Sequence, residues 1–467
     1  MSDPHLFNVF TPLGRIGRAR YLGTGLALLG LKHNIDRLLA HEFGYPWGFL
    51  NYWVFSGRGD IMELTPRDTG FYIALLLVAL PFIWAGITLT LRRLRDAELP
   101  LWLVILFFVP FLNVIFFIVL AAIPTRQSVD EESGLPSRVG RFLPESKFGS
   151  AIFGILITTL LGMLEIVLSA NGLKNYGWGL FVGIPFFLGL NSSLICGFHR
   201  PRSLGTCLLV ATISVLLVGL ALFALAFEGI ICLAMALPLA IPIALFGGFI
   251  GYEIQKRRTF SANTLHVVSV GVLLMPGLIF LEYAIGATPP VYEVKTSVVI
   301  KSDPETVWTH VVTFSQLPPP TEAMFKTGLA YPIRAEMHGQ GVGAERHCVF
   351  STGAFVEPIT VWDEPRLLAF GVSSQPPAMQ ELSIYNDVHP PHLDNYFIAQ
   401  RGQFELKRLP DGSTLLEGTT WYQNRYWPAQ YWHLWSDYIM EGIHKRVLLH
   451  IKSLAENGHK EAQKATR

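Results

Sequence analysis

Long apolar runs fill the chain as far as Pro289 and Pro290, whereas polar and apolar residues alternate from Val291 onward. A helix needs about 20 apolar residues to cross the core of a bilayer. The first part therefore predicts a polytopic membrane region, and the second part predicts a water-soluble domain. About eight apolar segments qualify as membrane segments, at residues 21–40, 70–91, 100–123, 148–168, 176–197, 203–227, 229–252 and 265–285.

Charged residues inside these segments are few. The first segment is the weakest, because Lys32, Asp36 and Arg37 interrupt its second half. Residues 203–252 contain one charged residue, Glu228, at the turn of an expected helical hairpin, and we predict an ordinary loop role for it. Glu165 lies within the run LGMLEIVLS, where an ionised side chain is costly, so we expect it to be paired, neutral or functional.

Basic residues in short loops favour the cytoplasmic side of a membrane. If the first two segments form a hairpin, the basic groups on either side of it are both cytoplasmic. If residues 100–123 re-enter at a kink at Pro110, the later basic loops are also cytoplasmic and the soluble domain faces the outside or periplasm. If they cross, those loops lie outside and the charge rule is broken. Both topologies stay open. The two groups are Arg15, Arg18 and Arg20, and Arg92, Arg93 and Arg95.

Three motifs mark the N-terminal part: GRIGRARYL at 14–22, RRLRD at 92–96, and FVPFLNVIFFI after it. They resemble a bacterial inner-membrane family of unknown function, number 805 among the domains of unknown function, over about residues 8–125. Arg95 replaces the histidine usual in that family, and the resemblance implies no known chemistry. We predict a membrane-interface group that pairs internally and with lipid phosphates, each cation contributing about 1 kcal/mol. Its members are Arg92, Arg93, Arg95 and Asp96.

The pattern from Val291 onward predicts one strand, a helix, six further strands and a closing helix. Asp303 followed by Pro304 is a favourable N-cap for the first helix. Asp411-Gly412 predicts a hairpin turn between the last two strands. Apolar residues three or four apart predict a helix over residues 429–456. The six strands are expected at residues 334–339, 344–351, 354–362, 366–372, 396–409 and 413–423.

The order of these elements and three stretches of text resemble the helix-grip superfamily, which includes START lipid-transfer domains, plant pathogenesis-related allergens and polyketide cyclases or dehydrases (SRPBCC). The stretches are VVIKSDPETVWTHV, GVGAERHCVFSTGAFVEPITVWDEPRLLAF and LPDGSTLLEGTTWYQNRYWPAQYWHLWSDYI. The resemblance implies a curved antiparallel sheet around a long C-terminal helix. It also implies a deep apolar cavity for a lipid or other hydrophobic ligand, with no shared catalytic residues and no cofactor.

We therefore expect a multi-domain protein, in which a polytopic α-helical membrane region is followed by a soluble α+β domain. We expect a three-segment inner-membrane domain at 1–125, a basic polar linker at 126–147 and a five-helix membrane bundle at 148–288. A START-like helix-grip domain at 291–457 and a polar tail at 458–467 follow.

Candidate ligand-binding residues lie on the strands and on the closing helix of the soluble domain. Charged residues within strands could orient a ligand head group, or could face water in ion pairs across neighbouring strands, which we favour. The aromatic residues are expected to pack the closing helix on the sheet or to form a cavity rim, because Tyr and Trp suit boundaries between water and apolar groups. The candidates are Arg346, Glu357, Glu417, Trp421, Tyr422, Trp432 and Asp437.

Other chemistry is not favoured. The four cysteines show no CxxC or Cys/His spacing, so neither a disulfide framework nor a zinc site is expected. The net charge of +1 argues against nucleic-acid binding. Residues 373–395 form a long Pro-rich segment of the kind that is often functional or a lid. In its HPPHLD text we expect surface histidines rather than metal ligands or catalytic residues, and the group concerned is Asp387, His389, His392 and Asp394.

The sequence therefore predicts a multi-pass protein of the bacterial inner membrane. Its soluble domain would bind a lipid or another hydrophobic ligand at the bilayer surface, to extract, present or sense it without covalent chemistry. Its expected partners are membrane lipids and that ligand. Two alternatives remain: a cyclase- or hydrolase-like enzyme acting on a membrane-embedded substrate, and transport by the helical bundle under regulation by the soluble domain. The identity of the ligand and the oligomeric state do not follow from the sequence.

Overall fold

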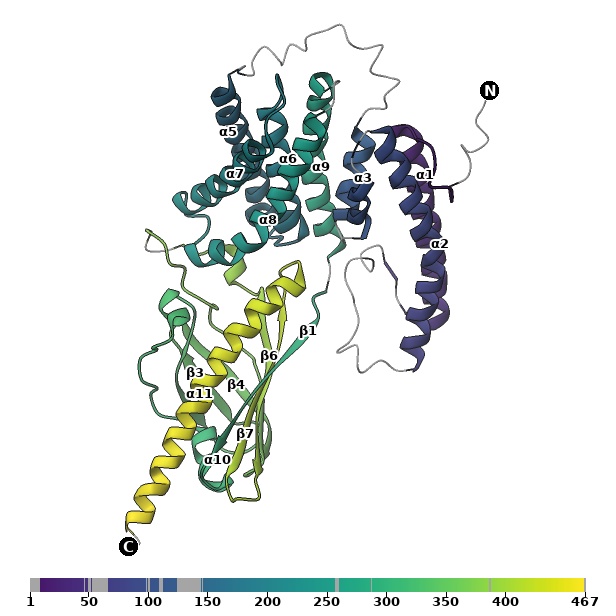
Figure 1. Ribbon diagram of the computed structural model, residues 1–467. Helices are drawn as coiled ribbons and strands as arrows, with labels where there is room; N and C mark the ends of the chain where they lie inside the picture. Colours follow the sequence, from purple (N-terminus) through teal and green to yellow (C-terminus); the bar gives the residue numbers. More distant parts are fainter. Residues whose placement is uncertain are drawn as a thin grey trace. The chain divides into compact units, whose positions relative to one another are not determined.

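The computed structural model in Figure 1 describes residues 9–45, 47–48, 52, 66–97, 99, 101–108, 112–123, 144, 146–256, 260–286, 288–385 and 388–465. The chain forms two compact units, which are considered one at a time. The first unit contains Met1–Leu222 and Ala236–Ala287, and the second contains Phe223–Met235 and Thr288–Arg467. The expected linker at 126–147 and the kink at Pro110 lie largely or wholly outside the described residues.

The first unit begins with two packed helices, α1 (Arg18–Phe43) and α2 (Pro66–Asp96), which lie side by side in Figure 1. The flank before α1 runs back along the C-terminal half of α2. Trp84 Nε1 donates to the Phe10 carbonyl at 3.0 Å, and Arg95 donates to the Pro12 carbonyl. The start of α1 and the end of α2 therefore lie at the same end of this pair, as in a hairpin.

The segment 97–123 begins and ends beside the C-terminal end of α2. They contain a 3₁₀ helix, η4 (Leu101–Phe108), and a helix, α3 (Leu112–Ala122). Arg93, near the end of α2, donates from Nε to the Leu120 carbonyl at 2.9 Å and from Nη2 to the Ile123 carbonyl. At 1.5 Å per residue, α3 is about 16 Å long, roughly half the thickness of a bilayer core. This geometry favours the re-entrant alternative for the third apolar segment.

Three members of the RRLRD group are buried in the structure. Arg93 is fully buried, and its guanidinium is occupied by Asp96 and by the carbonyls at the end of α3. Arg92 and Asp96 are also buried. Arg93 and Asp96 pair internally, as predicted, and the contacts of the group with lipid phosphates stay a prediction. These residues are buried because α3 folds back over the end of α2.

The remaining helices of the first unit pack into a bundle: α5 (Lys147–Ile166), α6 (Ile184–Cys196), α7 (Leu204–Ala224), α8 (Ile230–Gln255) and α9 (Phe260–Ile285). Among the described residues, five helical segments are long and apolar enough to cross a membrane. Glu165, on α5, is buried within this unit. The segments are Thr69–Asp96, Lys147–Gly172, Gly179–Cys196, Leu204–Ala224 and Ile230–Gln255.

The second unit is a seven-stranded antiparallel sheet with the order β1-β7-β6-β5-β4-β3-β2, closed by the long helix α11 (Ala429–Ala465). This arrangement, visible in Figure 1, confirms the predicted fold class. The helix runs to Ala465 and is thus longer than the sequence pattern indicated. The strands are β1 (Val291–Ile300), β2 (Pro332–His338), β3 (Glu345–Phe350), β4 (Gly353–Asp363), β5 (Leu367–Gly371), β6 (Phe397–Arg408) and β7 (Thr414–Asn424).

Local signals explain why these elements begin and end where they do. Asp303 caps α10 (Pro304–Val312), because its carboxylate accepts from the Thr306 backbone nitrogen at 2.8 Å. Gly412 has a φ of +83°, which supplies the left-handed position of the β6–β7 turn. Helix α11 packs against β1, β7 and α10, and its buried face includes Val447, Leu448 and Ile451. The interior of the domain thus lies between the sheet and this helix.

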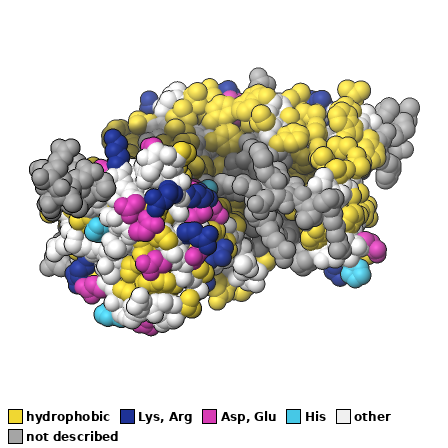
Figure 2. Space-filling model, turned by 90° about the horizontal axis from the view of Figure 1, so that it is seen from below, with side chains coloured by type: hydrophobic (Ala, Val, Ile, Leu, Met, Phe, Trp, Pro, Cys, Tyr) yellow, Lys and Arg dark blue, Asp and Glu magenta, His cyan; other side chains and the backbone are white. Residues whose placement is uncertain are grey.

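The surfaces of the two units differ in character. Figure 2 shows broad areas of hydrophobic side chains over the helical part, while acidic and basic side chains are interspersed over the sheet domain. Such an apolar exterior is expected of helices whose solvent is lipid. The short segment Phe223–Met235, which covers the α7–α8 turn, belongs by its contacts to the compact unit of the soluble domain. The boundary expected from the sequence near Pro289 therefore assigns this turn to the membrane region, although it packs with the soluble domain.

Candidate functional site

A buried ion pair lies inside the helix grip. Arg346 on β3 and Glu357 on β4 are directly opposite in the strand register, and their side chains form a salt bridge. Arg346 is 1% exposed and Glu357 is 6% exposed, so the expectation that these two residues face water was wrong. Both side chains point to the inner face of the sheet, where apolar residues rather than solvent surround them.

The surroundings of Arg346 are aromatic. Its guanidinium carbon lies 5.4–5.5 Å from the ring centroids of Phe314, Phe370 and Phe404. Its Nε is buried and has no hydrogen-bond partner among the described residues. Burial raises the pKa of Glu357, and the neighbouring guanidinium opposes that rise. An ion pair in this position contributes little net stability compared with apolar side chains of similar size, which suggests a role other than stabilising the fold.

A second polar group joins α11 to β7. The Tyr422 hydroxyl donates to Asp437 at 2.6 Å and lies 3.0 Å from His433 Nδ1. Tyr292 of β1 stacks on His433 with ring centroids 4.1 Å apart. Burial raises the pKa of the Tyr422 hydroxyl, and Asp437 adds to that rise. Tyr422 and Asp437, two of the predicted ligand residues, therefore meet in one network.

The other predicted residues are not part of either group. Glu417 forms an ion pair with Lys295 at 3.1 Å, across β1 and β7. Trp421 stacks beneath Arg401, with 4.2 Å between the guanidinium carbon and the ring centroid, and donates to Glu293. Trp432 is buried beside Tyr426 and Tyr431. The structure thus distributes the seven predicted ligand residues over several sites and does not unite them in one pocket.

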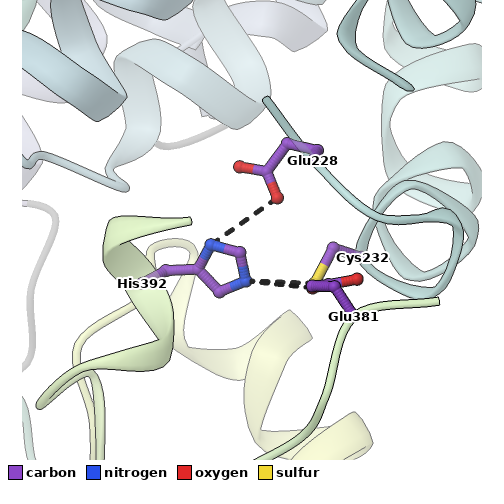
Figure 3. A group of neighbouring side chains, drawn as sticks. All are labelled: Glu228, Cys232, Glu381 and His392. Carbon is purple, nitrogen blue, oxygen red and sulfur yellow. Dashed lines mark hydrogen bonds and ion pairs between the residues drawn. The ribbon is translucent and has the colours of Figure 1, made fainter. Parts of the chain in front are cut away.

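A third group was not predicted and has the composition of a metal site. Figure 3 shows Glu228, Cys232, Glu381 and His392 facing one another. One potential ligand atom from each residue lies within 4.8 Å of all the others. Cys232 Sγ is 2.7 Å from Glu381 Oε1 and 3.0 Å from His392 Nε2. The other ring nitrogen of His392, Nδ1, lies 3.6 Å from Glu228 Oε2. All four residues belong to the second compact unit.

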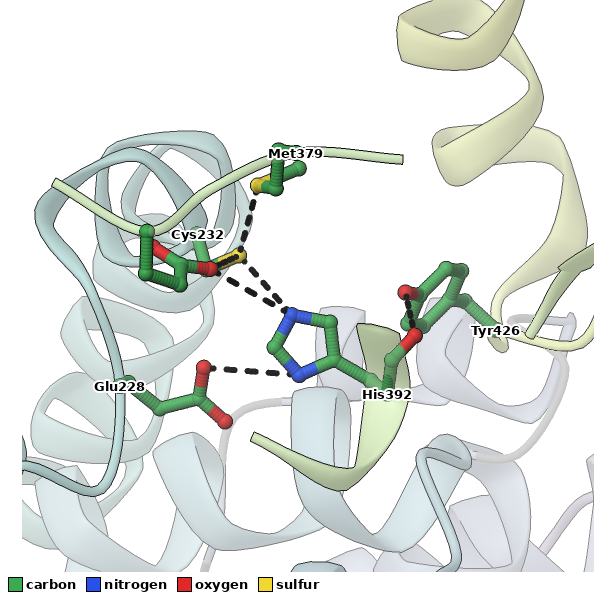
Figure 4. A network of polar contacts seen from close by, with 6 residues as sticks. Glu228, Cys232, Met379, His392 and Tyr426 are labelled. Atoms are coloured by element: carbon green, nitrogen blue, oxygen red, sulfur yellow. Dashed lines mark hydrogen bonds and ion pairs between the residues drawn. The ribbon is translucent and has the colours of Figure 1, made fainter. Parts of the chain in front are cut away.

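Two separate parts of the chain supply these residues. Glu228 lies at the α7–α8 turn and Cys232 in the first turn of α8, while Glu381 and His392 come from the Pro-rich segment 373–395. The Ile230 backbone nitrogen donates to the Leu382 carbonyl at 3.1 Å, which fixes the two parts side by side. His392 itself sits on a short 3₁₀ helix, and Figure 4 shows its carbonyl accepting from the Tyr426 hydroxyl.

None of these four residues was predicted from the sequence to belong to a site. Glu228 was assigned an ordinary loop role, and His392 was expected at the surface, yet His392 is 5% exposed. His389 is partly exposed and pairs with Asp394 at 3.0 Å, whereas Asp387 lies outside the described residues. A signal was present: Glu228 is the one charged residue within 203–252, and a cysteine follows it four positions later. Nothing in the spacing of the sequence connects it to residues more than 150 positions downstream.

Comparisons with known proteins cover parts of the chain. Residues 9–131 match a family model described as "Protein of unknown function (DUF805)", which confirms the resemblance of the N-terminal part. No curated protein matches the chain.

Similar solved structures each correspond to about a third of this chain. One is a protein from Nitrosospira multiformis, with 15% identity over 35% of this chain and 94% of that chain and a TM-score of 0.22. Another is a truncated norcoclaurine synthase from Thalictrum flavum, with 12% identity over 36% of this chain and 96% of that chain and a TM-score of 0.24. A third is the ginseng major latex-like protein 151 from Panax ginseng, with 14% identity over 35% and 96% and a TM-score of 0.22.

Proposed function

We propose that this membrane protein uses its helix-grip domain to bind a lipid or similar amphiphile at the bilayer surface, without covalent chemistry. The observation that carries the proposal is the Arg346–Glu357 pair inside an otherwise apolar interior. Binding sites for hydrophobic ligands are lined mainly by apolar and aromatic side chains with a few placed polar groups. The three phenylalanine rings and the spare Nε donor of Arg346 fit an apolar ligand that carries one acceptor group.

The tether to the membrane supports this function. Only residues 286–290 separate α9 from the first strand of the domain, so the domain samples lipids at a high effective concentration. A ligand taken from the bilayer would not need to diffuse through water. The class of ligand that fits is therefore a membrane amphiphile.

We further propose that the domain lies on the side of the membrane opposite the arginine-rich end of α2, outside the cytoplasm of a bacterium. Five helical passes, namely α5, α6, α7, α8 and α9, connect the end of the re-entrant segment to Thr288. This odd number changes sides. It also places Arg200, Arg202 and Lys256 with the arginines of α2, as the preference of basic loops for the cytoplasm requires.

The test is to purify the full-length chain in mild detergent and to identify the lipids that remain bound by native mass spectrometry. The informative variant is the double substitution R346M/E357L, which removes both charges and retains the volume. The matched control is K295M/E417L, because that ion pair also joins neighbouring strands but is solvent-exposed on the Lys side. Loss of a hydrogen bond to a charged group is worth about 1.5–3 kcal/mol, or roughly a tenfold or greater loss of affinity.

We expect one class of amphiphile to be enriched over bulk lipid in the wild type and in the control, and to be depleted about tenfold in R346M/E357L. Near-ultraviolet circular dichroism would establish that both variants keep their packed aromatic core. The proposal is wrong if no lipid is enriched in the wild type, or if both double variants retain the same lipid to the same extent.

A further inference from the structure

We infer that Cys232, Glu381 and His392 bind a zinc ion, with the Glu228 carboxylate orienting the histidine through its other ring nitrogen. Zinc in proteins is bound by thiolate sulfur, imidazole nitrogen and carboxylate oxygen, and these are the three donor types that the group presents. The site is separate from the grip interior and does not depend on the proposed lipid ligand.

The distances fit a tetrahedral ion. With zinc bonds of about 2.0–2.3 Å, neighbouring ligand atoms in a tetrahedral site are about 3.3–3.8 Å apart. His392 Nε2 is 3.6 Å from Glu381 Oε1, which already matches. Cys232 Sγ lies 2.7 Å from that oxygen and 3.0 Å from Nε2, so it needs to withdraw by less than about 1 Å to admit the ion. A rotamer adjustment of one cysteine side chain supplies a movement of this size.

The two ring nitrogens of His392 have different neighbours and would have different roles. Nε2 points to Cys232 and Glu381, whereas Nδ1 faces Glu228, as Figures 3 and 4 show. A histidine that ligates a metal commonly donates its other ring N–H to a carboxylate, which fixes the tautomer and the orientation of the ring. Glu228 is placed for this second role. The ion then has three protein ligands and one open position for water.

Burial makes a cation favourable here. Glu381 is 8% exposed, and its second oxygen, Oε2, is buried without a hydrogen-bond partner among the described residues. A buried carboxylate next to a thiol is costly unless a positive charge compensates it. The same arrangement argues against Cys232 as a free nucleophile, because a thiolate would be repelled by the carboxylate 2.7 Å away. Zinc binding would displace the thiol proton to solvent and leave the thiolate and the carboxylate neutralised.

Gly229 adds a steric argument. A Cβ atom at this position would overlap the Glu381 carboxylate. Glycine therefore allows this carboxylate to lie against the backbone of the α7–α8 turn, next to Cys232. The segment that carries Glu381 is also fixed on its other side, where the Gln380 backbone nitrogen donates to the Gly328 carbonyl at 2.9 Å. Binding of zinc would therefore tie the Pro-rich segment to the start of α8.

The test uses the full-length chain in detergent, stripped of metal with a chelator and then incubated with Zn²⁺ or Co²⁺ alone. Bound zinc is counted by mass spectrometry of the element, and cobalt is followed by the absorption band of its bond to thiolate sulfur. Variants C232A, E381Q and H392Q remove one ligand each. H389Q is the matched control, because His389 lies three positions away in the same segment but is partly exposed and pairs with Asp394.

We expect about one zinc per chain in the wild type and in H389Q, a thiolate–cobalt band in both, and loss of the band in C232A. E228Q should keep the stoichiometry and weaken zinc affinity by about 10–100-fold, as is typical when the carboxylate that orients a metal-bound histidine is lost. The rate at which iodoacetamide alkylates Cys232, measured on the wild type, gives a readout that needs no variant to fold. Zinc should suppress it, while the alkylation of Cys348 should not change.

Two results would overturn the inference. If the wild type binds no zinc and zinc does not protect Cys232, the four residues form a hydrogen-bonded network only. If zinc binds equally well to C232A and H392Q, the ion is held elsewhere in the chain.

Discussion

The pH dependence of the soluble domain offers a quantitative test of how α11 is held on the sheet. His444 lies on α11 between two strands, with Nε2 2.8 Å from Thr420 Oγ1 of β7 and Nδ1 3.2 Å from Thr296 Oγ1 of β1. Burial lowers the pKa of His444 from 6.5 to about 4, although Glu441 on the same helix acts in the opposite direction. The folded domain therefore favours the neutral imidazole.

The sign and size of the effect follow from this difference. The folded pKa is below the unfolded pKa, so the stabilisation is fully present above about pH 6.5 and is lost as the pH falls towards 4. The two values differ by about 2.5, and each pKa unit is worth about 1.36 kcal/mol, so the full effect is about 3 kcal/mol. Between pH 7 and pH 5 the expected loss is about 2 kcal/mol, or roughly a 20-fold change in the opening equilibrium.

The assay is hydrogen exchange of peptides from β1 and β7 in the full-length chain, with wild type and H444Q compared at the same pH. Glutamine retains hydrogen-bonding capacity but does not titrate, so intrinsic exchange rates and other titrating groups cancel in the ratio. We expect protection of the wild type relative to H444Q to fall about 20-fold from pH 7 to pH 5. H389Q, which changes a partly exposed histidine, should follow the wild type. A ratio that does not vary with pH would refute the assignment of a buried neutral imidazole.

Four further substitutions test individual contacts. R346M and E357L should each destabilise the soluble domain by about 3–5 kcal/mol in chemical denaturation, whereas the double variant should be near wild type, because one buried charge without its partner is worse than none. R93K should increase hydrogen exchange of α3 several-fold, since the single ammonium nitrogen of lysine cannot reach the three acceptors that Arg93 contacts with three separate nitrogens. D303A should lower the thermal stability of the soluble domain by about 1 kcal/mol through loss of the N-cap.

The sequence predicted well those features that depend on neighbouring residues. All seven strands of the sheet and the Asp303 N-cap were foreseen, because alternation, capping and turn chemistry act over a few positions. The re-entrant course of residues 97–123 was one of two alternatives, and charge asymmetry alone could not choose between them. The contact that favours re-entry is the one between Arg93 and the carbonyls at the end of α3, which no local pattern encodes.

The polar sites were harder to predict, since each depends on pairing between distant elements. Arg346 and Glu357 are 11 positions apart and share the inner face of a sheet. Strand alternation identified both as strand residues, but it did not establish which face was buried. The proposed zinc ligands are farther apart: Cys232 and His392 are 160 positions apart, in two segments that no sequence pattern connects. Metal-site patterns based on short spacing do not detect such a group.

The candidate zinc site and the membrane topology constrain each other. Glu228 and Cys232 precede the body of α8, and the soluble domain begins after α9, so the site can form only if α8 and α9 together return the chain to the side from which it left. Two crossings satisfy this condition, and they place Lys256, in the turn between these helices, on the opposite side.

Accessibility of cysteines introduced at Lys256 and Lys295 to a membrane-impermeant reagent tests the crossing of α9 directly. We expect the two positions to react from opposite sides of the membrane in intact cells or oriented vesicles. Their appearance on the same side would mean that α9 does not cross. In that case the positive-inside argument for the soluble domain fails together with the five-pass topology. The zinc site requires that the α7–α8 turn and Thr288 share a side, so it could then form only if α8 does not cross either.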